Sequence, residues 1–354
     1  MKASLSILGI LLVLILNLYF NVSVNSDQTA VNIEIPKITK LKSMPEALVL
    51  EGKHDVRRVL VSGLTLGGYW IDLSNEPSFT TTDTKVKIDS DGYIHPVAVG
   101  RTTVKVTFRR HSIDLPVNIK SVGTQPVSFV RDVMPAISRV GCNAGTCHGA
   151  AKGKNGFKLS LRGYDADLDY QTLVTDLSGR RFNRARPAQS LMLLKPTQGV
   201  PHGGGQVMEA DSRHYKIFHQ WIAEGVKSDV ITTEKVSRLE VIPNATEIHL
   251  PGMAQQLRVI AHYPDGTSRD VTRDAIYSSS LPDAATVSDS GFVTAVRRGE
   301  AVILVRYESL YSTSEIIVIG DRSGFKWAEV SQYNYIDGLV YDKLKRVRVL
   351  PSDL

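Results

Sequence analysis

Two segments of this 354-residue chain match each other, and the match limits how the chain can fold. Residues 87–108 read KIDSDGYIHPVAVGRTTVKVTF, and residues 286–307 read TVSDSGFVTAVRRGEAVILVRY. Three pairs share an offset of 199 residues, namely Gly92 and Gly291, Gly100 and Gly299, and Phe108 and Tyr307. Upstream, residues 41–52 match residues 239–252. One local fold must therefore suit both copies.

Both copies have the pattern of short β-strands joined by turns. TTVKVTF (102–108) alternates with period two, and AVILVRY (301–307) is its counterpart. YPDGTSRDVT (263–272) predicts a hairpin with an Asp-Gly turn. In the first copy LTLGGYWIDLS (64–74) replaces that hairpin, and neither copy has a cysteine for an intersheet disulfide. We predict two immunoglobulin-like β-sandwiches, at 31–121 and 235–320.

The segment between the copies, residues 122–234, has helical periodicity instead. Apolar residues recur at helical spacing early in it, at Val130, Val133, Ile137 and Val140. A last helix is predicted to begin at Asp211 or Ser212 and to end at Gly225. Helices at both ends of a segment with long loops are typical of a small c-type cytochrome, in which haem forms much of the core. We therefore expect a multidomain protein, with two all-β sandwiches flanking a mainly α, cytochrome c-like domain.

Both cysteines of the chain lie in this segment, within GCNAGTCHGA (141–150). Covalent haem needs two thiols and an adjacent histidine, which Cys142, Cys147 and His148 supply. Four residues separate the cysteines where two are usual, and small residues with a glycine allow the longer loop. A Cys142–Cys147 disulfide, free thiols or an adventitious metal are the alternatives. Tetrahedral zinc usually needs more ligands at tight spacing.

Longer motifs carry a resemblance to a known family. Three stretches of the middle segment resemble the cytochrome c-like domain of large planctomycete exported proteins. They are FVRDVMPAISRVGCNAGTCHGAAKGKNGFKLSLRGYDADLDYQTL and the later VPHGGG and WIAEGV. The flanking copies resemble bacterial immunoglobulin-like group 2 (BIG2) domains. The resemblance implies one covalent haem c, and a truncated chain that lacks two long C-terminal domains. Residues 325–354 would be the helical start of the first of these.

The sixth iron ligand is left open by the sequence. The related domains have a methionine-proline pair before the last helix, where this chain has VPHGGG (200–205). We favour His202 over Met208, and an open site is a further alternative. Met192 lies in an apolar run and is expected in the core. His214 and His219 are expected to be packing or solvent-facing histidines.

The first residues and the charge suggest where the protein acts. Residues 1–26 have one lysine, an apolar run and a small-residue end, which is the layout of a secretory signal peptide. We expect export to the periplasm or the cell surface. The net charge of +6 is spread over a long chain, so we expect no nucleic-acid partner.

Two functional hypotheses follow. The first is an exported haem protein for electron transfer or redox sensing, with an unknown redox partner and no catalytic residue set. The second is a haem-free binding or structural protein of the cell surface. In it the immunoglobulin-like modules contact a surface or a polysaccharide, and Cys142 and Cys147 form a disulfide.

Overall fold

The structure is a computed structural model that describes residues 34–322 and 324–352. The expected signal peptide, residues 1–26, lies outside the described residues. No helix in the described ranges is long and apolar enough to span a membrane. Residues 35–354 cluster as one compact unit.

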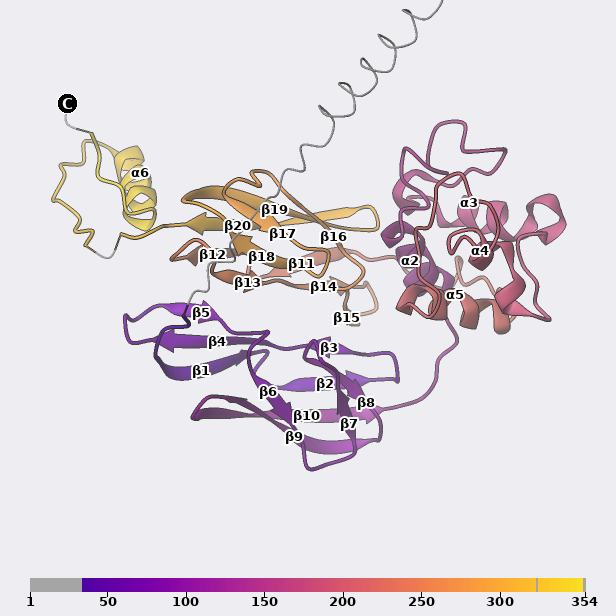
Figure 1. The fold of residues 1–354 in the computed structure, drawn as a ribbon, viewed down its shortest axis with the longest axis horizontal. Helices are drawn as coiled ribbons and strands as arrows, with labels where there is room; N and C mark the ends of the chain where they lie inside the picture. Colours follow the sequence, from indigo (N-terminus) through magenta and orange to yellow (C-terminus); the bar gives the residue numbers. More distant parts are fainter. Residues whose placement is uncertain (1–33, 323, 353–354) are drawn as a thin grey trace, which may run out of the picture. The chain divides into compact units, whose positions relative to one another are not determined.

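The two repeat copies form two β modules with the same strand order (Figure 1). The first contains β1 (Ile38–Met44), β2 (Leu48–Glu51), β3 (Arg57–Arg58), β4 (Leu60–Thr65), β5 (Trp70–Asp72), β6 (Ser78–Thr80), β7 (Val86–Ile88), β8 (Tyr93–Pro96), β9 (Gly100–Phe108) and β10 (His111–Ser121). The second contains β11 (Arg238–Ile242), β12 (Ala245–Ile248), β13 (Ala254–Gln256), β14 (Arg258–His262), β15 (Ser268–Asp270), β16 (Ile276–Ser279), β17 (Ala285–Val287), β18 (Phe292–Ala295), β19 (Gly299–Tyr307) and β20 (Leu310–Val318). The sheets are β1-β4-β5, β2-β10-β9-β6 and β3-β8-β7, and the second module repeats them with each number raised by ten.

Alternating side chains of these strands build a separate core in each module. On β9 the inward-facing residues are Val104, Val106 and Phe108, and all three are buried. The inward positions of β19 are buried in the same way. Burying one such side chain contributes about 1.5–3 kcal/mol relative to leaving it exposed. The alternation seen in the sequence therefore corresponds to one buried face on each strand.

A glycine under an aromatic ring explains one invariant feature of the repeat. Gly92 and Gly291 both have positive φ, at 77° and 75°. A Cβ at Gly291 would lie 2.9 Å from the Tyr277 ring, and one at Gly92 would lie 3.3 Å from the Phe79 ring. Both the turn conformation and the space thus require glycine.

The first copy keeps the hairpin that its sequence seemed to lack. β4 and β5 pair antiparallel in the first module, as β14 and β15 do in the second. Gly68 takes positive φ in the first turn and Gly266 in the second. GGYW therefore substitutes for PDGTS because both supply a glycine where the turn needs one.

The expectation of a mainly α, cytochrome c-like domain is wrong. The segment between the modules contains η1 (Phe129–Val133), α2 (Met134–Arg139), η2 (Leu161–Gly163), α3 (Ala166–Tyr170), η3 (Gln171–Thr175), η4 (Asp176–Gly179), η5 (Pro187–Gln189), α4 (Leu191–Leu194) and α5 (Arg213–Ala223). Only α5 exceeds six residues, and loops and turns make up most of the segment. The described chain as a whole is mostly β-sheet.

Aromatic side chains form the core of this middle segment, which we had expected haem to fill. Phe129 and Trp221 are fully buried, with ring centroids 5.2 Å apart. Trp221 also donates a hydrogen bond to the carbonyl of Lys227. Ser212 caps α5 by accepting from the backbone of Tyr215, and the predicted bounds of that helix are confirmed.

The helix expected near the end of the chain is present as α6 (Tyr335–Arg346). Asn334 and Asp337 form a capping box at its first turn. Lys343 and Arg346, in its last turn, pair with Glu315 of β20. The second module therefore holds this helix by charge.

We expect residues 235–320 to fold alone and to melt cooperatively. This span contains all ten strands and the whole hydrophobic cluster of the second module. Its apolar core needs no side chain from elsewhere, so the free energy of unfolding should be positive at room temperature. Circular dichroism with a thermal melt checks this. A disordered spectrum would contradict the prediction.

Candidate functional site

The cysteine segment leaves α2 through a tight turn. Gly141 has φ of +82°, and the amide of Cys142 donates to the carbonyl of Ile137 at 3.1 Å. The amide of His148 in turn donates to the carbonyl of Cys142 at 3.0 Å. These bonds fold the loop back, so that His148 is held beside the end of α2.

Both thiols are free in the structure. Cys142 packs partly against the core of the middle segment. Burial, together with the nearby Cys147 thiol, raises the pKa of Cys142 to about 12. At neutral pH the Cys142 thiol is therefore protonated and a poor nucleophile.

His148 is held in one tautomer. Its Nδ1 donates to the carbonyl of Phe157 at 3.1 Å, because a carbonyl can only accept. The two rings also pack, with centroids 4.4 Å apart. Desolvation lowers the pKa of His148, and the nearby His202, Arg181 and Lys154 lower it as well. The imidazole is thus neutral, with the lone pair of Nε2 available to a ligand.

His202 lies opposite His148 and is held in the same way. Its Nδ1 donates to the carbonyl of Gly205 at 2.8 Å, which also leaves Nε2 available. The two imidazole centroids are 6.4 Å apart, and the ring planes differ by 19°. The structure thus brings together two predicted site residues that are 54 positions apart in the sequence.

The other candidate ligands lie in different surroundings. Met208 is 5% exposed and belongs to the core, where Met192 also packs. His214 contacts Asp274, and His219 stacks on Tyr215. These placements make Met208 a packing residue, as Met192 was expected to be.

A metal site built from protein ligands alone is not found. No group of three or more His, Cys, Asp or Glu side chains in the described part of the chain could hold a metal ion. The common C-x-x-C-H motif is also absent from the sequence. The expectation of a cytochrome c fold is therefore corrected, and the alternative of an adventitious metal held by protein ligands alone has no support in the described residues. What remains is a pair of histidines, one of which directly follows Cys147 in the chain.

A second candidate site is the contact between the two β modules. Asp72 of β5 accepts a hydrogen bond from the amide of Gln256 at 3.0 Å. Asp270, its counterpart 198 residues later, accepts from the amide of Arg58 at 2.9 Å. Arg58 and Gln256 also correspond in the repeat, so the two contacts are reciprocal. Burial raises the pKa of Asp72 to about 6, although hydrogen bonds from Ser74 and Gln256 oppose the rise.

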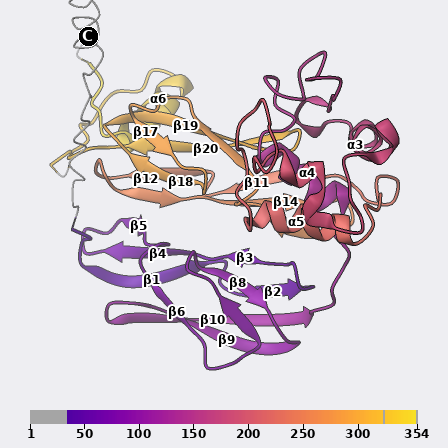
Figure 2. The ribbon, with the colours of Figure 1, turned by 45° about the vertical axis from the view of Figure 1, so that its right-hand side comes forward.

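The hairpin end of the second module, residues 268–274, also reaches the other parts. Arg273 pairs with Asp89 and Asp91 at 2.8 Å and lies 3.6 Å over the Tyr93 ring. Arg269 pairs with Asp132 of the middle segment at 2.7 Å, and Asp274 pairs with Arg213. Figures 1 and 2 both show the second module beside the first, with the middle segment at one end.

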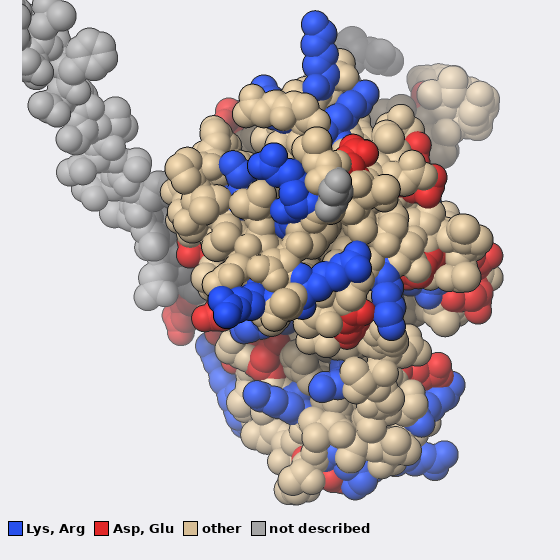
Figure 3. Space-filling model, turned by 90° about the vertical axis from the view of Figure 1, so that its right-hand side faces the viewer, with Lys and Arg blue, Asp and Glu red and all other residues tan. Residues whose placement is uncertain are grey.

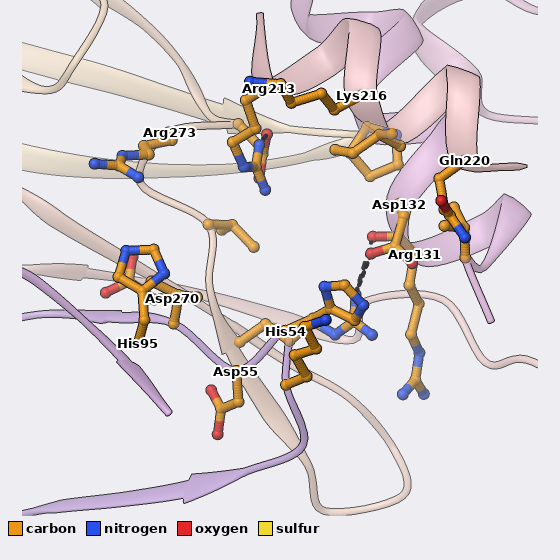
Figure 4. Close-up of a pocket in the computed structure, with 18 of the residues that line it drawn as sticks. His54, Asp55, His95, Arg131, Asp132, Arg213, Lys216, Gln220, Asp270 and Arg273 are labelled. Atoms are coloured by element: carbon orange, nitrogen blue, oxygen red, sulfur yellow. Dashed lines mark hydrogen bonds and ion pairs between the residues drawn. The ribbon is translucent and has the colours of Figure 1, made fainter. Parts of the chain in front are cut away.

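A cleft of about 630 Å³ lies where the three parts meet. Figure 4 shows His54 and His95 from the first module facing Asp132, Arg213 and Lys216 across it. Many of its charged side chains are already engaged with each other, as the hairpin contacts show. We therefore interpret the cleft as a joint between the three parts.

The residues of this joint were not predicted from the sequence. DGTSRDVT indicated only a turn, although the hairpin carries charges that the first copy lacks. The basic run Arg180–Arg186 in the middle segment was not predicted as a functional feature either. The signal for both was a local change in charge. Asp165 caps α3 by accepting a hydrogen bond from the backbone amide of Leu168.

No protein-family model and no curated protein matches the chain. Solved structures of the surface-layer protein SbsC, including those of domains 5–6 and of domains 4–9, are similar to it. Domains 5–6 have 11% identity and a TM-score of 0.32, covering 81% of this chain and 100% of that one. Domains 4–9 have 10% identity and a TM-score of 0.30, covering 80% and 32%. Drosophila OTK extracellular domains 3–5 score 0.17 at 9% identity, covering 79% and 61%. At these scores the likeness supports no inference.

We expect Glu308→Gln to stabilise the protein more at pH 8 than at pH 5. Burial raises the pKa of Glu308 to about 7, although Lys235, Arg131 and Arg269 oppose the rise. The folded state thus binds the proton of Glu308 more tightly than the unfolded state does. The free energy of unfolding therefore falls as pH rises from about 4.5 to about 7. Glutamine has no carboxyl proton to lose, so the variant does not show this fall.

The gain at pH 8 should be roughly 1–3 kcal/mol. Urea unfolding at both pH values measures it. Glu46→Gln, at an exposed position between β1 and β2, is the control. An equal gain at both pH values would contradict the explanation.

Proposed function

We propose that this protein is exported and acts at the cell surface as a structural or binding protein, in which two β-sandwich modules brace the middle segment. The leader-like residues 1–26 support export. The mostly β architecture of the described chain supports the surface role. A link to planctomycete exported proteins stays a prediction from the sequence motifs.

The reciprocal contact between the modules carries this proposal. Each module supplies one carboxylate to a backbone amide of the other, and Arg273 adds a third contact. A hydrogen bond to a charged group contributes about 1.5–3 kcal/mol. The side chains of Arg273 and Asp89 are 29% and 25% exposed, so water screens their pair only in part. Such a joint keeps two modules in a fixed arrangement, which is what a spacer or a rigid binding unit requires.

We expect Arg273→Ala to loosen the joint without unfolding the modules. Arg273 binds residues of the first module but lies outside the core of its own module. Amide hydrogen exchange at residues 89–93 and at Gln256 should become roughly 5- to 150-fold faster, the factor for a loss of about 1–3 kcal/mol.

Arg297→Ala is the matched control, because its pair with Asp283 is exposed and lies within one module. Exchange mass spectrometry on both variants makes the comparison. Equal exchange in wild type and Arg273→Ala would remove the rigid joint from the proposal.

A second candidate function is haem binding, and the histidine pair favours it. Each of the two imidazoles would keep its Nε2 lone pair for a metal ion, because its Nδ1 already donates to a backbone carbonyl. His148 and His202 are separated by 6.4 Å with nearly parallel planes. Two histidines fill only two positions of a metal ion. Haem supplies four nitrogens of its own, so it fits this pair where a bare metal ion does not.

The surrounding residues also fit the group. Cys142 and Cys147 are free to form thioethers, and His148 directly follows the second cysteine. The carbonyls of Phe157 and Gly205 orient the two imidazoles through Nδ1. When bound, haem would supply a one-electron redox centre. His148 and His202 would hold the iron, and burial of the site would tune its potential.

We expect the exported protein to keep haem on a denaturing gel when it is made with a haem c attachment system. Cys147→Ser should lose most of the covalent haem. His202→Ala should keep the haem but give a high-spin absorption spectrum, because one of the two histidines that would hold the iron is missing.

His219→Ala and Met208→Ala are the controls, since His219 stacks on Tyr215 and Met208 packs in the core. Neither should change the spectrum. A colourless wild-type protein would exclude this second candidate and leave the first untouched.

A further inference from the structure

The loops around the histidine pair carry only positive charge. Residues 133–164 and 177–208 contain ten Lys and Arg and no Asp or Glu. The sequence as a whole has nearly balanced charge, with 42 basic and 36 acidic residues. The excess is therefore concentrated in these two loop regions, although it looks spread out when the chain is counted as a whole.

The fold brings the two loop regions together. The guanidinium of Arg181 lies 4.3 Å over the Phe157 ring, which joins the second region to the first. Lys195 donates to the carbonyl of Pro201, beside His202. Figure 3 looks toward the middle segment and shows several Lys and Arg side chains on that face, with Asp and Glu at its edge and also between them.

Six of these cations are exposed and unengaged, and we name this set the basic face. It consists of Lys152, Lys154, Lys158, Arg180, Arg184 and Arg186. None of the six makes a side-chain hydrogen bond or an ion pair within the described ranges. By contrast, Arg139, at the end of α2, is paired with Asp289. Six uncompensated charges on one face repel each other, and an anionic partner would remove that repulsion.

We propose that the basic face binds an acidic polysaccharide, that is, a linear sugar polymer with sulfate or carboxylate groups. The inference deepens the proposed surface role, on which it rests, by naming the class of partner. Three arginines within seven residues suit such groups, because guanidinium binds an oxyanion through two parallel hydrogen bonds.

The composition of the face separates this partner from two others. The two loop regions expose four large apolar or aromatic side chains, but all four lie outside the two stretches that carry the six cations, residues 152–158 and 180–186; they are Leu161, Tyr164, Leu177 and Val207. A protein partner normally buries an apolar or aromatic centre, and neither cationic stretch exposes one. Single-stranded nucleic acid needs exposed aromatic rings for base stacking, and the two rings within the cationic stretches, Phe157 and Phe182, are only partly exposed. Tyr164 is exposed outside these stretches, so binding of oligo-dT is measured as well.

The test measures binding of the full exported chain to dextran sulfate, polygalacturonate, neutral dextran and oligo-dT by calorimetry at two salt concentrations. We expect both acidic polysaccharides to bind and neutral dextran not to bind. Their relative affinities separate sulfate from carboxylate recognition. The triple variant R180Q/R184Q/R186Q should bind about tenfold or more weakly, with a shallower salt dependence because fewer counterions are released.

Two further variants make the result specific. K152Q/K154Q/K158Q should weaken binding as well, since it removes the other half of the basic face. R101Q/K105Q/R110Q removes the same charge from exposed positions of the first module and should leave binding unchanged. An equal loss in this control, or tighter binding of oligo-dT than of either polysaccharide, would overturn the proposal.

Hydrogen exchange at Gln256, measured on the same samples, reports on the joint between the modules. Intact protection without polysaccharide binding would reject the basic face as a binding site and leave the structural role standing.

Discussion

The hairpin end at residues 268–274 is the part of the structure on which the arrangement of the rest depends. Two arginines and two aspartates alternate along this segment, and neighbouring side chains contact different parts of the protein, either the first module or the middle segment. Asp270 and Arg273 bind the first module, whereas Arg269 and Asp274 bind the middle segment. Within the hairpin, Thr272 donates to Asp270 and accepts from the amide of Val259, which holds the carboxylate in place. Strand β15 and the turn that follows it therefore connect three separate cores through four charged side chains.

Repetition and periodicity made much of the fold predictable from the sequence. A glycine in each turn and alternating apolar residues have one consistent structural solution, and both copies adopt it. Helix α5 was predictable because Ser212 caps it and Gly225 follows it. The middle segment was not, because its long loops have no period. The conformation of these loops depends on which side chains pack against Phe129 and Trp221 in the core, and the sequence does not show those contacts.

The candidate site shows the same division. Local spacing was enough to select Cys142, Cys147 and His148, because these residues are neighbours in the chain. In the folded chain His202 lies opposite His148, and Met208 packs in the core. Both placements depend on contacts between distant residues, and the sequence could only suggest them through the composition of the loop. The sequence shows the basic face as a local excess of Lys and Arg. The net charge of the whole chain hides this excess, because acidic residues elsewhere compensate for it. Local charge windows would have found it.

The reciprocal contact between the modules has a consequence for assembly. Because each copy uses the same patch to receive the other, the pairing is isologous, as in a two-fold symmetric dimer, and it is complete with two members. Asp72 and Asp270 each already hold their amide. A further module of the same kind could not extend the array through this surface. A lattice or filament would have to grow through a different, head-to-tail surface, so the duplication gives a closed unit and not an open-ended chain.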